Sequence, residues 1–157
     1  MKKDKKLMLI SSVGGHLTQL LQLKPLFSKY EYHLVTEKTE ITKEMKHDHP
    51  VSFLTYGARN YPVKYIFKFS FNIIKSLFLF LKHRPDVIIT TGAHTAVPMC
   101  YIAKLFRKKV IYIESFAKTS SPNLSGKLIY PIADLFVVQW ESMKKVYPKA
   151  VNGGSIY

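Results

Sequence analysis

Short apolar runs alternate along the chain with segments of helical character, and this alternation most constrains the fold. A strand that pairs in parallel on both sides is buried on both faces, so its sequence is continuously apolar. Such runs, each followed by a helical segment, indicate a parallel sheet covered by helices on both faces. We therefore expect residues 1–157 to form one α/β domain, with a Rossmann-like, doubly wound, mostly parallel sheet.

The sequence places the elements of this sheet by their apolar runs and by their ends. Strands are expected at Leu7–Val13, Tyr32–Thr36, Val51–Thr55, Val87–Thr91, Val110–Glu114 and Leu135–Gln139. Helices are expected at His16–Ser28, Pro62–His83, His94–Phe106, Ser125–Ile132 and Ser142–Tyr147, with room for a short one before the third strand. Several strands end on small or polar residues, and ligands bind at the carboxyl ends of strands in open α/β sheets.

The first turn, Gly14-Gly15, joins a buried strand to a helix. Two glycines let the backbone approach a ligand closely, and the first N–H groups of the helix form a ready anion site. His16 begins the helix, where an imidazole can contact a sugar or phosphate or act as a base. The third glycine of the dinucleotide-binding fingerprint is missing. Taken alone, the turn is better explained as a tight turn with a surface histidine.

Two further turns follow later strands. Gly92 permits a tight turn before the helix that contains His94, and either feature alone has a purely structural explanation. Glu114-Ser115 ends another strand on a carboxylate, which is poorly placed for packing in a core. A doubly wound sheet brings all three turns to one edge. Their convergence favours a binding site over three unrelated turns.

The bulk composition limits the chemistry and the partners. The formal charge of +14 favours nucleic acid, an anionic membrane surface or phosphorylated substrates as partners, although a lysine-rich surface also serves solubility. Cys100 is the only cysteine, which excludes a disulfide framework and a cysteine-based zinc site and suits a reducing cytoplasm. No metal-ligand cluster is evident. The apolar run after the basic N-terminus is too short for a signal peptide.

A stripe of lysines marks the expected long helix. At 100° per residue the lysines fall within about 40° of one another, and most other residues are aliphatic or aromatic. The lysines of the stripe are Lys64, Lys68, Lys75 and Lys82. Four lysines make a membrane-spanning helix too costly. The helix is either a crossover helix with lysines on its wet side, or an interfacial helix with lysines at anionic headgroups.

The interfacial alternative is favoured here, with a partner-protein surface as its main rival. A crossover helix needs an apolar face of only about 100°, and this helix has a much wider one. The aromatic side chains expected to enter the lipid are Phe67, Phe71 and Phe78.

These motifs, in this order, resemble those of the accessory subunits of bacterial capsular and exopolysaccharide glycosyltransferases. The chain is also similar to the membrane-anchoring subunit of the dolichol-pathway N-acetylglucosamine transferase and to the N-terminal half of the lipid II-forming transferase. The matching residues are Ser11–Leu17, Thr91–Pro98, Ile113–Ser115, Ser125–Pro131 with Ala133-Asp134, and Val138–Glu141. The eukaryotic subunit has an N-terminal membrane-spanning helix for which this sequence offers no counterpart, so attachment would fall to the lysine-striped helix.

The resemblance implies a GT-B enzyme divided between two subunits. This chain would bind a polyprenyl-diphosphate-linked saccharide and dock on the cytoplasmic face of the cell membrane as a peripheral protein. A separate subunit would bind the UDP-sugar, and this chain would bind no cofactor and have little or no activity alone. The sugar would be transferred with inversion during polysaccharide biosynthesis. The sequence does not indicate which sugar is donated or accepted.

Inversion requires a base that takes the proton of the acceptor hydroxyl, and His16 and Glu114 are both candidates. Contacts to the acceptor or its phosphates are expected from Gly14, Gly15, His16, Gly92, His94 and Ser115. The alternatives are a non-catalytic membrane scaffold that stimulates a partner, a complete small enzyme, and a nucleic-acid binder. The last is disfavoured because the lysines lie among buried-type aliphatic residues and no known nucleic-acid-binding module is evident.

Overall fold

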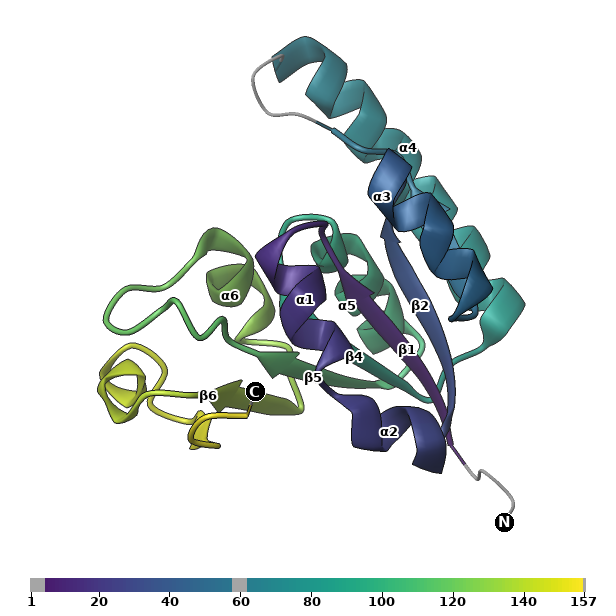
Figure 1. Cartoon of the computed structure of the whole chain (residues 1–157). Helices are drawn as coiled ribbons and strands as arrows, with labels where there is room; N and C mark the ends of the chain where they lie inside the picture. The colour runs from purple at the N-terminus through teal and green to yellow at the C-terminus, as the bar shows by residue number, and fades with distance from the viewer. Residues whose placement is uncertain (1–4, 58–61, 157) are drawn as a thin grey trace.

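The computed structural model describes residues 5–57 and 62–156, with side chains from residue 66 onward in the second range. Its strands are β1 (Lys6–Ser11), β2 (Glu31–Glu37), β3 (Val51–Leu54), β4 (Val87–Gly92), β5 (Lys109–Ile113), β6 (Leu135–Val138) and β7 (Val151–Asn152). They form one parallel sheet in the order β3-β2-β1-β4-β5-β6-β7 (Figure 1). The expected Rossmann-like parallel sheet is therefore confirmed.

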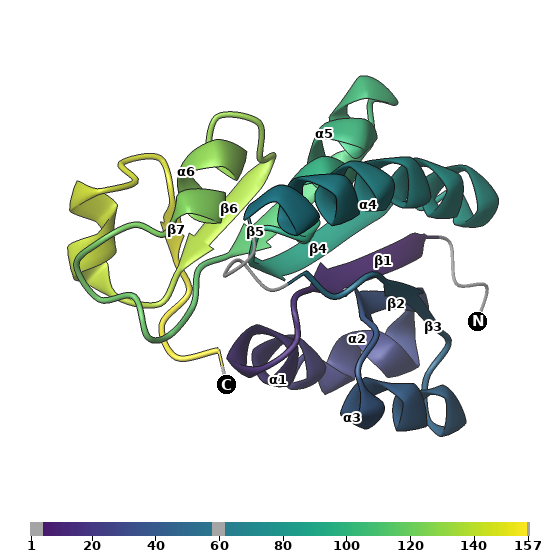
Figure 2. The same cartoon turned by 90° about the horizontal axis from the view of Figure 1, so that it is seen from above.

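Helices cover both faces of this sheet. They are α1 (Gly15–Leu21), α2 (Lys24–Lys29), α3 (Glu40–Lys43), α4 (Pro62–His83), α5 (Ala96–Leu105) and α6 (Leu124–Ile129), with 3₁₀ turns η1 (Glu44–His47) and η2 (Glu141–Lys145). Figure 2 shows α1, α2 and α3 on one face and α4, α5 and α6 on the other. This arrangement is the doubly wound architecture that the alternation of elements predicted.

The core forms on both sides of the central strand β1 because its side chains alternate between the two faces. Met8 and Ile10 belong to the cluster under α4, α5 and α6, which also contains Met99. Leu9 lies on the opposite face in the cluster that contains Leu20 of α1. All five side chains are fully buried. The three on β1 are buried because a strand that is paired on both sides has both faces covered.

Three expected elements differ from the structure. The helix expected over His16–Ser28 is broken into α1 and α2, because Pro25 has no backbone N–H and starts a new helix. The helix expected from His94 begins at Ala96, so His94 lies in the preceding turn. The last helical segment is a 3₁₀ turn, and the two-residue strand β7 was not foreseen.

The topology places the switch point of the sheet at β1. From β1 the chain continues to β2 on one side, and later enters β4 on the other side of β1. In sheets of this class, ligands bind outside the carboxyl ends of the two strands from which the chain connections run in opposite directions, here β1 and β4. The register between β1 and β4 shifts at Ile10/Ser11, just before this point.

Candidate functional site

The first two predicted turns meet at the carboxyl ends of β1 and β4. His16 Nδ1 lies 2.6 Å from the carbonyl oxygen of Thr91, and the Thr91 hydroxyl donates to the His16 carbonyl at 2.7 Å. A carbonyl oxygen only accepts, so Nδ1 carries the proton in this contact and Nε2 keeps its lone pair. The backbone of β4 therefore fixes the tautomer in which Nε2 can accept a proton.

The surroundings of His16 favour its neutral form. The residue is half-buried, and burial lowers the pKa of its imidazole, an effect that the hydrogen bond to Thr91 partly offsets. Burial disfavours the charged imidazolium because charge is poorly solvated in a protein interior. An uncharged imidazole with a fixed Nδ1–H is the form needed in a general base.

Gly92 lets the two turns approach this closely. Its φ of +99° lies outside the range that residues with a side chain readily adopt. A Cβ at this position would lie 3.2 Å from His16 Cε1 and 3.2 Å from the Tyr112 hydroxyl. Gly14 and Gly15 differ, since both are exposed and a Cβ on either would meet no heavy atom within 4 Å.

Glu37, at the end of β2, is a further polar residue at this edge of the sheet, and it is not among the residues predicted from the sequence. Its side chain is 2 % exposed and accepts hydrogen bonds from the Val13 amide at 3.2 Å and the Thr95 hydroxyl at 3.1 Å. His94 Nε2 lies 3.7 Å from Glu37 Oε1, and the hydroxyls of Ser12 and Thr95 are 2.6 Å apart. Burial is the main cause that raises the pKa of the Glu37 carboxyl.

The predicted Glu-Ser turn lies further along the same edge, after β5. Glu114 is fully buried and accepts from the Ser115 amide at 2.9 Å, from Asn123 Nδ2 at 2.5 Å and from the Tyr147 hydroxyl at 3.2 Å. Burial is the main cause that raises the pKa of this carboxyl. Tyr112 contacts Asn123 and adjoins the place of a Gly92 Cβ, so it separates Glu114 from His16.

The structure thus brings the predicted residues together in three groups. His16 lies against the turn of Gly92, and His94 lies against the unforeseen Glu37. Glu114 and Ser115 belong to a separate hydrogen-bonded cluster behind Tyr112. Within the described residues, no group of three or more His, Cys, Asp and Glu side chains is placed to hold a metal ion.

The solvent-exposed face of helix α4 is mostly apolar. Its inner residues Asn72 and Ser76 are buried, whereas Phe67, Ile74 and Phe78 on the other side are 73 %, 68 % and 63 % exposed. Other outer residues more than one-third exposed are Ile66, Phe71, Ile73, Leu77 and Leu81. The helix is thus a crossover between β3 and β4 that packs on the sheet, as in the first alternative, but its solvent side is mostly apolar rather than lined by lysines alone.

The lysines of α4 lie along one border between its two faces. At 100° per residue, Lys68, Lys75 and Lys82 fall about 20–60° from the buried Leu79, on one side of it. Lys68 donates to the carbonyl of Tyr56 at 3.1 Å. The side chain of Lys64, the fourth lysine of the expected stripe, lies outside the described residues.

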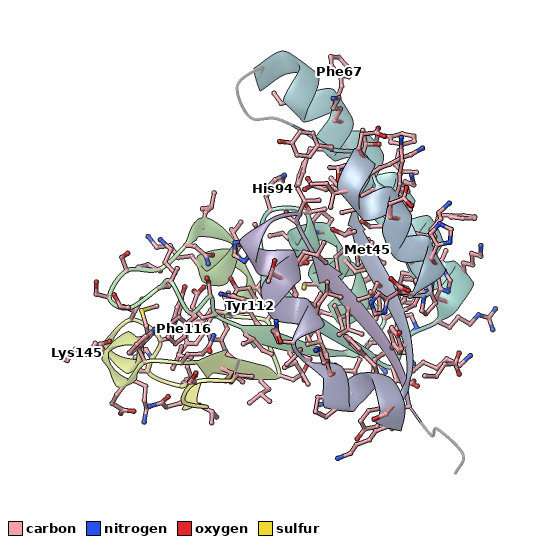
Figure 3. The ribbon with its side chains drawn as sticks, in the orientation of Figure 1. Met45, Phe67, His94, Tyr112, Phe116 and Lys145 are labelled. Carbon is pink, nitrogen blue, oxygen red and sulfur yellow. The ribbon has the colours of Figure 1, made fainter. Side chains whose placement is uncertain are left out.

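The N-terminal half of α4 extends beyond the carboxyl edge of the sheet. Figure 1 shows this half rising past the ends of β1 and β2, and Figure 3 shows Phe67 on it, with His94 between it and the sheet. The exposed apolar face and the edge with His16 therefore lie at the same end of the molecule. Within the described residues, no helix combines the length and apolar character needed to cross a bilayer.

Comparison with known proteins identifies a family. Residues 56–156 match the family model described as "Oligosaccharide biosynthesis protein Alg14 like". The UDP-N-acetylglucosamine transferase subunit ALG14 of Mus musculus is 27 % identical, over 99 % of this chain and 84 % of its own length. The subunit of the same name from Candida albicans is 42 % identical over 50 % of this chain and 39 % of its own length.

Solved structures with a similar fold are longer proteins. MurG of Acinetobacter baumannii superposes with a TM-score of 0.70 and 17 % identity, over 85 % of this chain and 41 % of its own. The UDP-GlcNAc 2-epimerase of Methanocaldococcus jannaschii superposes with a TM-score of 0.67 and 16 % identity, over 89 % of this chain and 41 % of its own. The likeness shows that this chain has the fold of one part of a GT-B protein.

Proposed function

The chain belongs to the family of Alg14-like oligosaccharide biosynthesis proteins, and we propose that it is the acceptor-binding, membrane-docking subunit of a two-subunit inverting glycosyltransferase. In this proposal the whole chain, residues 1–157, acts as one unit. The reaction transfers a sugar from a UDP-sugar to a hydroxyl group of a polyprenyl-diphosphate-linked saccharide. The proposal rests on the fixed tautomer of His16, in which Nε2 can accept a proton, at the carboxyl edge of the sheet, the end of the molecule beyond which the N-terminal half of α4 extends.

The donor site belongs to a separate subunit in this account. The solved proteins of similar fold are more than twice as long as this chain, and the chain corresponds to 41 % of each. The relatives in mouse and Candida albicans are named as subunits of a transferase. These names support an enzyme made of more than one subunit. We propose that the UDP-sugar pocket is on a partner, with the reaction in the cleft between the two, and that this chain binds no cofactor and has little or no activity alone.

His16 is the proposed base. Its Nε2 takes the proton of the acceptor hydroxyl while that oxygen attacks the anomeric carbon. The bond between the anomeric carbon and UDP breaks on the opposite side, UDP leaves with the bonding electron pair, and the configuration inverts. The Thr91 carbonyl, which accepts from Nδ1–H at 2.6 Å, stabilises the positive charge that forms on the ring.

The other predicted residues receive supporting roles. We propose that His94, held near Glu37, and the exposed Gly14-Gly15 backbone contact the diphosphate of the acceptor. Glu114 is fully buried among its hydrogen-bond donors, so we assign it the positioning of the turn with Ser115 rather than proton transfer. Gly92 contributes by leaving room for His16.

Docking on the membrane is assigned to the outer face of α4. Phe67, Phe71 and Phe78 would enter the acyl region while Lys68, Lys75 and Lys82 remain at the level of the headgroups. An acceptor anchored in the same membrane by its polyprenyl chain would then reach the edge that carries His16. We propose attachment as a peripheral protein on the cytoplasmic face of the cell membrane, and a product used in capsular or exopolysaccharide biosynthesis.

Reconstitution tests this function. The chain and its donor-binding partner are purified separately and together, and sugar transfer from UDP-N-acetylglucosamine or UDP-galactose to a polyprenyl-diphosphate-linked saccharide is measured. The proposal expects transfer by the pair and little or none by either protein alone. Full transfer by the partner alone would reduce this chain to a scaffold, and transfer by this chain alone would make it a complete enzyme.

A further inference from the structure

A groove lined by three lysines crosses the outer edge of β3, the last strand on that side of the sheet. Its volume is about 280 Å³, and Phe53 and Leu79 form part of its apolar lining. The three lysines are Lys38, Lys46 and Lys75. Only the last of these belongs to the stripe on α4.

The three lysines come from three separate elements. Lys38 follows β2, Lys46 is in η1, and Lys75 projects from α4 on the opposite face of the sheet (Figure 2). The Lys46 ammonium lies 5.5 Å from the centroid of the Phe53 ring, within the range of a cation–π interaction. Folding therefore brings Lys75 to the same hollow as Lys38 and Lys46, which are close to each other in the sequence.

No carboxylate among the described residues neutralises this group. None of the three ammonium groups forms an ion pair or a hydrogen bond with a described residue. The charge of Lys38 acts on Glu40, but that carboxylate is paired with Lys43 at 2.6 Å. Like charges around one hollow repel one another, and an anion bound between them would relieve this repulsion.

The groove adjoins the apolar outer face of α4 through one residue. Phe71 is four residues before Lys75 and Phe78 is three residues after it, so both lie beside it on the helix surface. These two phenylalanines are 54 % and 63 % exposed. An occupant of the groove would thus have cationic groups on one side and an apolar surface directly beside them.

We propose that the groove of Lys38, Lys46 and Lys75 binds the phosphate group of an anionic phospholipid, whose acyl chains lie along Phe71 and Phe78. The site combines the two properties of such a lipid, a negative phosphate and an apolar chain next to it. A soluble phosphate would use only the first. The inference rests on the proposed membrane docking and adds a single headgroup site, which fixes how α4 is turned about its axis and where the His16 edge faces.

Vesicle binding by the full chain tests this site. Binding is compared for phosphatidylcholine vesicles with and without phosphatidylglycerol, using Lys38→Gln/Lys46→Gln and a control of equal charge loss, Lys24→Gln/Lys29→Gln, on the exposed surface of α2. A basic side chain at an anionic surface contributes about fivefold in affinity. The groove variant should therefore bind anionic vesicles about 30-fold more weakly, and the control should lose much less.

Two outcomes would overturn the inference. Equal losses in the groove variant and the control would show a general charge effect, and no loss in either would show that the groove does not contact lipid. Phe67→Ser/Phe78→Ser should weaken binding to both kinds of vesicle. If only this aromatic variant loses binding, docking through α4 stands and the headgroup site falls; if it binds like the parent chain, the proposed docking itself fails.

A soluble lipid separates the headgroup from free phosphate. The ring signals of Phe53 are followed by NMR during addition of monomeric dihexanoylphosphatidylglycerol or inorganic phosphate, because Lys46 lies over this ring. The proposal expects the lipid to shift these signals at a lower concentration than phosphate does, and Lys38→Gln/Lys46→Gln to abolish the shift. If the lipid and phosphate shifted the signals at the same concentration, a phospholipid site would be contradicted. The same would follow if an acidic peptide or an oligonucleotide bound more tightly than the lipid.

Discussion

Replacement of Gly92 by alanine tests the close contact between the two glycine turns. A side chain at φ +99° costs on the order of 1–3 kcal/mol in backbone strain. The new Cβ would also lie 3.2 Å from His16 Cε1 and from the Tyr112 hydroxyl, and both groups are held in place by hydrogen bonds. With about 1 kcal/mol for this crowding, the loss in the free energy of unfolding should be about 3 kcal/mol.

Gly154→Ala is the matched control. Gly154 also has a positive φ, +63°, but a Cβ there meets no heavy atom within 4 Å. Its replacement should cost only about 1–2 kcal/mol of backbone strain. A loss of 1 kcal/mol lowers the melting temperature of a domain of this size by about 2–4 °C.

Thermal unfolding followed by circular dichroism should therefore show a decrease of about 9 °C for Gly92→Ala and about half of that for Gly154→Ala. Gly92→Ala should also shift the NMR signal of His16 Cε1–H, because the ring must move. Equal melting temperatures for the two variants, with an unchanged His16 signal, would refute the role given to Gly92.

Three further predictions concern His33, Glu37 and the outer face of α4. Burial, with smaller contributions from His83 and Lys82, lowers the pKa of His33 from 6.5 to about 4, so the unfolded chain takes up this proton at a higher pH than the folded chain. As the pH falls from about 6.5 to about 4, the free energy of unfolding should therefore decrease, and it should decrease less steeply in His33→Gln. Glu37→Gln puts an amide NH₂ group among donors, so it should cost about 1–3 kcal/mol in urea unfolding and weaken acceptor binding; unchanged values of both would contradict its positioning role. Phe67→Ser/Phe78→Ser should reduce sedimentation with vesicles at unchanged melting temperature, and undiminished sedimentation would argue against docking by this face.

The sheet was predictable because its strands are continuously apolar. β1 and β4 are paired on both sides, and their sequences contain few polar residues before the carboxyl end. The bounds of α4 were predicted correctly because Arg84 and Pro85 end its apolar pattern. The break between α1 and α2 was missed, although Pro25 signals it, because leucines continue the helical pattern across the break.

The candidate site was only partly predictable. The glycine turns identified the region of His16 and Gly92, because turns after parallel strands meet at one edge. Glu37 also ends a strand on a carboxylate, as Glu114 does, so the signal that indicated Glu114 is present for Glu37 as well. The contact between His16 and Thr91 depends on the register of β1 and β4, which the sequence does not encode in any local pattern.

The two faces of α4 also required the structure. Periodicity located the lysines on one narrow stripe but did not show which side of the helix packs on the sheet. The side that packs on the sheet is marked by Asn72 and its buried neighbours. The side-chain amide of Asn72 accepts a hydrogen bond from the Thr55 N–H and donates one to the Thr55 carbonyl, each at 2.8 Å. Polar residues on a buried face give no hydrophobic signal, so the sequence could not distinguish the inner face from the outer one.

In the proposed reaction His16 supplies the base and a partner subunit supplies the donor. Single-turnover sugar transfer by the reconstituted pair, measured across a pH range with the parent chain and with His16→Ala, tests this role of His16. The pair containing His16→Ala should fold and assemble, but its transfer rate should be at least about 100-fold lower than that of the parent pair. The rate of the parent pair should decline only below pH 6.5, because burial lowers the pKa of this imidazole. An unchanged rate and pH profile in His16→Ala would contradict this role.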